Sequence, residues 1–154
     1  MKKINKQNFK NTLSKFATGI TVVATNKNST LYGKTINSFS SLSLSPSLVL
    51  FSLDKKSSKL DIFNSSKLLT INVLSKKQKS ISNNFSKQTP DWENIQFYLT
   101  KDGIPVLKNC VSNLDCKVVD KISKGDHIIF ICKVIKVLNN EKLKPLIYFN
   151  SKYL

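Results

Sequence analysis

The chain contains no arginine: its 25 basic residues are all lysines, set against nine acidic residues, and the formal net charge is +16 at pH 7. Proteins that read bases or grip phosphates at two points favour the guanidinium group of arginine. The lysines are also scattered among many Asn, Ile and Ser residues, a mixture typical of AT-rich codon usage. We therefore interpret most of the charge as solvated surface and expect no nucleic-acid partner. Anionic small molecules would still be attracted to the chain.

Cysteine and histidine are scarce as well. The three cysteines are an odd number, and no pair has the two-residue spacing of a zinc knuckle or a redox motif. A disulfide framework is therefore excluded. With His127 as the only histidine, we also predict no metal site. Cys116 and Cys132 stand inside apolar segments, so we expect them to be buried, reduced thiols.

Glycine is too sparse for a glycine-rich phosphate loop. The four glycines stand at positions 19, 33, 103 and 125, and this spacing allows neither G-x-G-x-x-G nor a P-loop. If a nucleotide binds, hydroxyl groups, lysines and loop amides would have to hold its phosphate.

Long hydrophobic runs are absent too. The longest apolar segment, Ile128 to Leu138, is interrupted by Lys133 and Lys136 and is too short to cross a membrane. The basic start MKKINKQNFK is not followed by the apolar stretch of a secretory signal. We therefore expect a cytoplasmic protein without a membrane partner. Its 154 residues, 40% of them hydrophobic, suffice for one domain over residues 1–154 with a sizeable core.

The hydrophobic pattern predicts a mainly β protein with two or three short helices. Helices are expected at residues 5–16, ended by Gly19, and at 57–64 and 78–85. Strands are expected at 20–25, 31–39, 48–53, 68–74, 114–122, 127–138 and 145–149, with an irregular polar segment at 86–99. Residues 123–126, SKGD, predict a hairpin turn. Because most connections lack a crossover helix, the strands should form an antiparallel barrel rather than a parallel sheet.

Two polar clusters follow neighbouring strands. The first is KTINSFSSLSLSP, residues 34–46, which carries six serines or threonines on an apolar pattern too regular for a disordered linker. The second, KKSSK at residues 55–59, stands at the expected start of a helix, where free N–H groups favour an anion. Ser57 or Ser58 as a simple helix cap is the alternative. Together the two clusters favour a site for a small, planar, anionic ligand.

Five segments carry a family resemblance: FATGITVVAT at 16–25, GKTINSFSSLSLSPSLVLFSL at 33–53, INVLSKKQ at 71–78, GDH at 125–127 and PLIYFNSKY at 145–153. Their order and spacing resemble the flavin reductase-like family, the reductase components of two-component flavin-dependent monooxygenases. The resemblance implies a Greek-key antiparallel split barrel that forms a homodimer. It also implies hydride transfer from NADH or NADPH to FMN or FAD, with the reduced flavin passed to a partner monooxygenase.

The same resemblance implies site residues by position. Those expected along the flavin ring and ribityl chain are Thr35, Ile36, Asn37, Ser38, Phe39, Ser41 and Leu42. The phosphate is expected at Lys56, Ser57 and Ser58, and the distal part of the flavin near Lys87 and Gln88. The nicotinamide side would comprise His127, Tyr148, Phe149, Asn150 and Ser151. His127 is the expected catalytic residue, which orients the nicotinamide or stabilises charge; a plain turn histidine is the alternative.

The C-terminal motif, IYFNS at residues 147–151, lacks the Arg and Gly that are common in the family. This departure keeps open a flavin-binding carrier or electron-transfer protein without efficient NAD(P)H turnover. A basic nucleic-acid-binding barrel is a third hypothesis, and it requires exposed aromatic rings that stack on bases. Aromatic residues make up only 9% of the chain and mostly follow the apolar pattern. The choices between FMN and FAD, and between NADH and NADPH, stay open.

Overall fold

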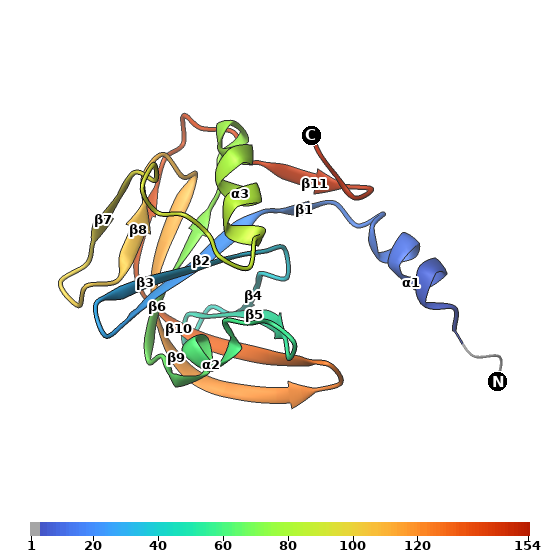
Figure 1. Ribbon diagram of the computed structural model, residues 1–154, viewed down its shortest axis with the longest axis horizontal. Helices are drawn as coiled ribbons and strands as arrows, with labels where there is room; N and C mark the ends of the chain where they lie inside the picture. The colour runs from blue at the N-terminus through green and yellow to red at the C-terminus, as the bar shows by residue number, and fades with distance from the viewer. Residues whose placement is uncertain (1–3) are drawn as a thin grey trace.

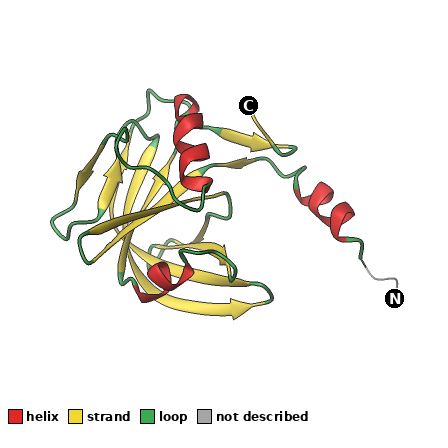
Figure 2. Cartoon of the chain, in the orientation of Figure 1, coloured by secondary structure: helices red, strands yellow, loops and turns green. Residues whose placement is uncertain are grey.

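The computed structural model describes residues 4–154, and within them strands dominate (Figures 1 and 2). The helices are α1 (Lys6–Leu13), α2 (Leu60–Ser65) and α3 (Lys79–Ser86), with a 3₁₀ turn at Lys76–Gln78. The strands are β1 (Thr18–Gly19), β2 (Thr21–Lys27), β3 (Thr30–Ile36), β4 (Ser40–Ser43), β5 (Leu48–Asp54), β6 (Leu68–Val73), β7 (Phe97–Leu99), β8 (Pro105–Leu107), β9 (Ser112–Lys124), β10 (His127–Asn139), β11 (Ile147–Phe149) and β12 (Lys152–Tyr153).

The main sheet has seven antiparallel strands in the order β3-β2-β6-β9-β10-β5-β4. Its two edge strands, β3 and β4, are consecutive in the chain and are joined only by residues 37–39. A flat sheet of this size would separate its edges by about 29 Å, whereas so short a link reaches about 14 Å. The sheet must therefore curl until the end of β3 and the start of β4 lie within about 14 Å of each other. This result confirms the predicted antiparallel barrel.

Two apolar clusters fill the molecule, and strand β2 contributes to both because its side chains alternate between faces. Val23 belongs to the barrel interior, where the Phe51 and Phe130 rings stack with centroids 4.9 Å apart. Val22 belongs to a second cluster, beneath α3, that includes Phe85. The cysteines at positions 110, 116 and 132 are buried free thiols, which confirms the prediction for Cys116 and Cys132.

Helix α3 packs on β3 at Gly33. A Cβ atom at this position would lie 2.5 Å from the fully buried Phe85 ring, so only glycine permits the approach. The Thr35 hydroxyl group donates to the Ser82 carbonyl oxygen at 2.7 Å, and the Ser82 and Tyr153 hydroxyl oxygens are 2.8 Å apart. Helix α3 is therefore held between β3 and the C-terminal hairpin formed by β11 and β12.

Several predicted boundaries were wrong. Helix α1 ends at Leu13 rather than Phe16, and Gly19 lies in β1, paired with Ile147, rather than at a helix end. The strand predicted at 31–39 ends at Ile36, because residues 37–39 make the turn into β4. Within the segment predicted to be irregular, Phe97–Leu99 forms β7 by pairing with β8.

The helix predicted at 57–64 starts at Leu60, so neither Ser57 nor Ser58 is its N-cap. Lys59 occupies that position, without a capping side-chain bond. The predicted 123–126 turn is confirmed: Lys124 and His127 pair across Gly125 and Asp126, and Gly125 has a φ angle of +54°.

Helix α1 extends away from the rest of the chain (Figure 1). The Asn5 side chain caps it by accepting hydrogen bonds from the Gln7 and Asn8 amides, but none of its residues is buried. No helix within residues 4–154 is long and apolar enough to span a membrane.

Candidate functional site

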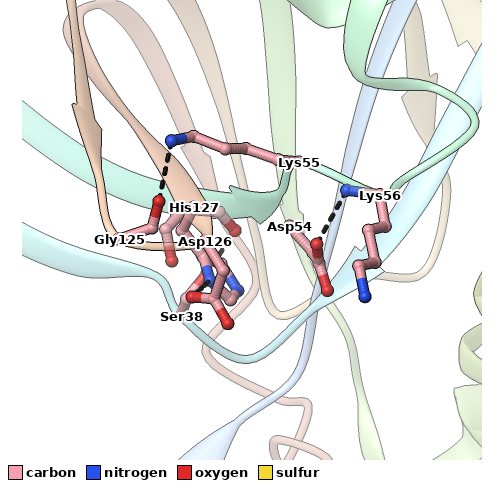
Figure 3. A network of polar contacts seen from close by, with 8 residues as sticks. Ser38, Asp54, Lys55, Lys56, Gly125, Asp126 and His127 are labelled. Atoms are coloured by element: carbon pink, nitrogen blue, oxygen red, sulfur yellow. Dashed lines mark hydrogen bonds and ion pairs between the residues drawn. The ribbon is translucent and has the colours of Figure 1, made fainter.

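The loop after β5 is fixed against the tip of the β9–β10 hairpin (Figure 3). The Lys55 ammonium group donates to the Gly125 carbonyl oxygen at 2.7 Å, and the Lys55 amide donates to the Asp126 carbonyl oxygen at 2.9 Å. Asp54 lies opposite His127 in the sheet register. These contacts place the 55–59 cluster and the single histidine at one end of the barrel, although more than sixty residues separate them in the sequence.

A cleft of about 330 Å³ opens where this loop meets the end of β3. Seven of the predicted site residues line it: Thr35, Ile36, Asn37, Ser38, Lys56, Ser57 and His127. The remaining lining residues, which the sequence alone did not single out as site residues, are Lys34, Ser52, Leu53 and Asp54. The cleft thus combines residues from the ends of β3 and β5 with the first residue of β10.

Part of the hydroxyl-rich stretch serves the fold rather than the cleft. The Ser38 hydroxyl group donates to the Ser52 carbonyl oxygen and accepts from the Ser52 amide, both at 3.0 Å, and so ties the exit of β3 to β5. The Thr35 hydroxyl group is already bonded to Ser82. The exposed Asn37 makes no side-chain hydrogen bond within residues 4–154, so its amide group can bind a ligand.

His127 and Asp126 form a pair at the hairpin tip (Figure 3). The His127 Nδ1 atom lies 2.8 Å from the Asp126 carboxylate, with 42% of the histidine side chain exposed. The hydrogen bond from His127 holds the pKa of the Asp126 carboxyl group below its usual value. When Nδ1 carries the proton of this bond, Nε2 is free to contact a ligand.

The rim of the cleft is positively charged. Lys34 and Lys56 line it, and Lys59 is buried beside it. The only acid in the lining is Asp54, whose carboxylate accepts a hydrogen bond from the Lys56 amide at 2.7 Å (Figure 3). The Ser57 hydroxyl oxygen accepts only a long bond, 3.4 Å, from the Lys59 amide, so it can still donate to a ligand. Cations and a free hydroxyl group suit a phosphate.

Other predicted residues lie outside the cleft lining. Phe39 packs on the barrel core, Ser41 and Leu42 are exposed on β4, and Ser58 is exposed on the loop. Lys87 and Gln88 follow α3, where the Gln88 carbonyl oxygen accepts a hydrogen bond from the Lys59 ammonium group at 2.6 Å.

The C-terminal candidates belong to the β11–β12 hairpin. Tyr148 stacks edge-on against Tyr153, and Phe149 pairs with Lys152. Asn150 and Ser151 form the hairpin turn with positive φ angles, and the Asn150 side chain accepts from Lys15 at 2.8 Å. The single chain therefore does not bring residues 148–151 into the cleft beside His127.

A family model described as the flavin reductase like domain matches residues 13–154. The chain belongs to the flavin reductase-like family. FMN reductase (NADH) SmoA of Agrobacterium fabrum is 31% identical over 137 residues, which cover 89% of this chain and 79% of that protein. The reductase subunit HsaB of a flavin-dependent monooxygenase of Mycobacterium tuberculosis is 31% identical over 153 residues, covering 97% of this chain and 82% of that protein.

The structural comparison agrees with this family. The flavin reductase PheA2 in its native state superposes with a TM-score of 0.91 at 38% identity, covering 98% of this chain and 97% of that one. The fold is therefore the split barrel of the flavin reductases, as the sequence predicted.

Proposed function

We propose that the protein is an NAD(P)H:flavin oxidoreductase that reduces FMN or FAD and supplies the reduced flavin to a partner monooxygenase. The observation that carries the proposal is the convergence of Asn37, Lys56, Ser57 and His127 on one cleft in a chain of the flavin reductase-like family. The similarity to SmoA, an NADH-dependent FMN reductase, supports the reaction. The similarity to HsaB, the reductase subunit of a monooxygenase, supports the partner.

The residues of the cleft fit a flavin. Lys34, Lys56 and Ser57 would hold its phosphate, since they offer two ammonium groups and a free hydroxyl group on one rim. Asn37 would bind a polar edge of the ring through its unoccupied amide group. A bound flavin supplies the hydride-accepting ring, so the protein needs no side-chain nucleophile.

His127 would act on the nicotinamide side. The Asp126 carboxylate fixes the orientation of the imidazole ring through the 2.8 Å contact at Nδ1. The Nε2 atom would then bind the amide group of the nicotinamide or stabilise charge during the hydride transfer. The need for NAD(P)H also supports a cytoplasmic location.

The test is the visible absorption spectrum of the purified protein during titration with FMN and FAD. We expect saturable binding, followed by oxidation of NADH or NADPH at 340 nm when free flavin is added. Binding without NAD(P)H oxidation would identify the protein as a flavin carrier. The bond between Asn150 and Lys15, which holds this predicted nicotinamide-side residue away from the cleft, favours that alternative. Absence of flavin binding would overturn both functions.

We further infer a homodimer. The support is the outstretched α1, on which Phe9 is 52% exposed, Leu13 57% and the following Phe16 77%. Spacings of four and three place these side chains on one stripe of the helix and its extension. Hydrogen bonds from the Asn150 amide to the Ser14 carbonyl oxygen and from Lys15 to Asn150 attach the residues that follow α1 to the C-terminal hairpin. An apolar stripe that its own chain does not cover suits a symmetric partner.

A further inference from the structure

Lys59 is a buried lysine with almost no compensation for its charge. The residue is 8% exposed, although lysine is rarely buried unless it is paired. The ammonium group can donate three hydrogen bonds, yet it makes one, to the Gln88 carbonyl oxygen at 2.6 Å. Within residues 4–154 the only ion pair is His127–Asp126, so no described carboxylate balances Lys59.

A second lysine makes this environment less favourable still. Burial lowers the pKa of the Lys59 ammonium group, and the neighbouring positive charge of Lys34 lowers it further. Lys34 approaches the same segment, with its ammonium group 3.4 Å from the Ser86 carbonyl oxygen. Two cations therefore share one region with only backbone carbonyl oxygens as partners. Such an arrangement destabilises the flavin-free protein.

The position of Lys59 shows which group could balance the charge. Lys34, its electrostatic neighbour, lines the cleft, and so does Ser57, whose hydroxyl oxygen accepts a bond from the Lys59 amide. Lys59 itself is not part of the lining, and its backbone amide contacts the rim at Ser57. A phosphate on the rim would lie close enough for a partly buried charge to act on it, because screening is weak there.

We propose that Lys59 is a specificity-determining residue that makes the cleft prefer phosphorylated flavins over riboflavin by its buried charge. The inference rests on the proposed function. Lys59 does not contact the ligand; it sets the electrostatic potential of the rim that Lys34, Lys56 and Ser57 form. The charge is retained at a cost in stability that a bound phosphate offsets.

A purely structural role makes the opposite prediction for stability. Ser86 is the last residue of α3. In the structural alternative, the sole role of Lys59 and Lys34 is to donate hydrogen bonds to carbonyl oxygens at the C-terminal end of this helix. Removing a helix cap lowers stability. Removing an uncompensated buried charge while keeping its apolar stem leaves stability unchanged or raises it.

The experiment compares Lys59→Met, which keeps the stem, with Lys59→Gln, which keeps a neutral donor. Dissociation constants for FMN and riboflavin are measured by quenching of flavin fluorescence, and Tm is measured without flavin. We expect both variants to bind FMN about tenfold more weakly, with riboflavin affinity changed less than twofold. We also expect Lys59→Met to have a Tm at least equal to wild type. The exposed Lys67→Met is the control for net charge.

Equal losses for both flavins, or no loss for FMN, overturn the proposal. A lowered Tm together with equal losses identifies the helix cap instead. Full retention of FMN affinity by Lys59→Gln shows that the hydrogen bond matters rather than the charge, and this result also overturns it. If the wild-type protein binds neither flavin, the proposed function itself fails, and the inference fails with it.

Discussion

The Lys55 ammonium group donates to the Gly125 carbonyl oxygen at 2.7 Å and so joins the loop after β5 to the tip of the β9–β10 hairpin (Figure 3). Lys56 and Ser57 follow on the loop, and His127 begins β10 directly after the hairpin turn. The geometry between the proposed phosphate-binding rim and the histidine therefore depends on this contact as well as on the pairing of β5 with β10.

We expect Lys55→Met to weaken flavin binding by a few-fold only. The contact is exposed, and the Lys55 amide still donates to Asp126, so the loop loosens without detaching. Titration of flavin absorbance measures the change, with the exposed Lys117→Met as a charge-matched control. Equal behaviour of the two variants would show that the Lys55–Gly125 bond does not position the loop.

The double substitution Lys56→Ala and Ser57→Ala should weaken flavin binding at least about tenfold. It removes a cation and a hydroxyl donor from the rim, and charge-assisted hydrogen bonds contribute roughly 1.5–3 kcal/mol each. Ser58→Ala is the control, since Ser58 is exposed beside the cleft without lining it. Unchanged flavin affinity in a folded double variant would show that the phosphate does not bind at Lys56 and Ser57.

His127→Ala should leave flavin binding nearly intact and impair the use of NAD(P)H. A residue that binds only the donor raises KM, whereas one that stabilises charge as the hydride moves also lowers the rate of reduction. Stopped-flow reduction of the flavin at varied NADH separates the two effects. If the variant is reduced at the wild-type rate with wild-type NADH dependence, His127 is only a turn residue.

The sequence predicted the elements whose cause is local. The β-branched run in Thr21–Lys27 and the 123–126 turn were both predicted, because periodicity and turn residues act over a few positions. Strand β7 was missed, since a three-residue segment becomes a strand only by pairing, and its partner β8 is another three-residue strand that was not predicted. The late start of α2 was missed because residues 54–60 form two successive turns, closed by the bonds from the Ser57 amide to Asp54 and from the Leu60 amide to Ser57.

The candidate site divides in the same way. The cleft lining includes seven residues that the family pattern located, whereas the sequence identified neither Lys34 as a lining residue nor Lys59 as a buried lysine. A sequence does not distinguish an exposed lysine from a buried lysine whose ammonium group donates to a carbonyl oxygen far along the chain. Their difference arises from contacts with residues 86–88, which only the folded chain brings near.

Replacing Leu13 with Asp should disrupt the proposed homodimer without unfolding the chain. Leu13 is 57% exposed in the single chain, so the carboxylate has no cost there, but it would be desolvated in an apolar interface. Sedimentation velocity at micromolar concentration would show a dimer for the wild type and a monomer for the variant. Asn11→Asp, an exposed change on the same helix, is the control. A monomeric wild-type protein that still reduces flavin would contradict the proposal.

The buried thiols should make the protein sensitive to alkali. Burial raises the pKa of Cys110 from 9.0 to about 11 and that of Cys132 to about 12. Well below pH 9 the thiols are neutral in both states and stability is unaffected. Above it they ionise only in the unfolded chain, so the free energy of unfolding falls by about 1.4 kcal/mol per pH unit for each thiol. Urea unfolding between pH 8 and 11 measures this slope. The substitution Cys132→Ala should make it shallower by one proton, and an unchanged slope would mean that Cys132 does not titrate on unfolding.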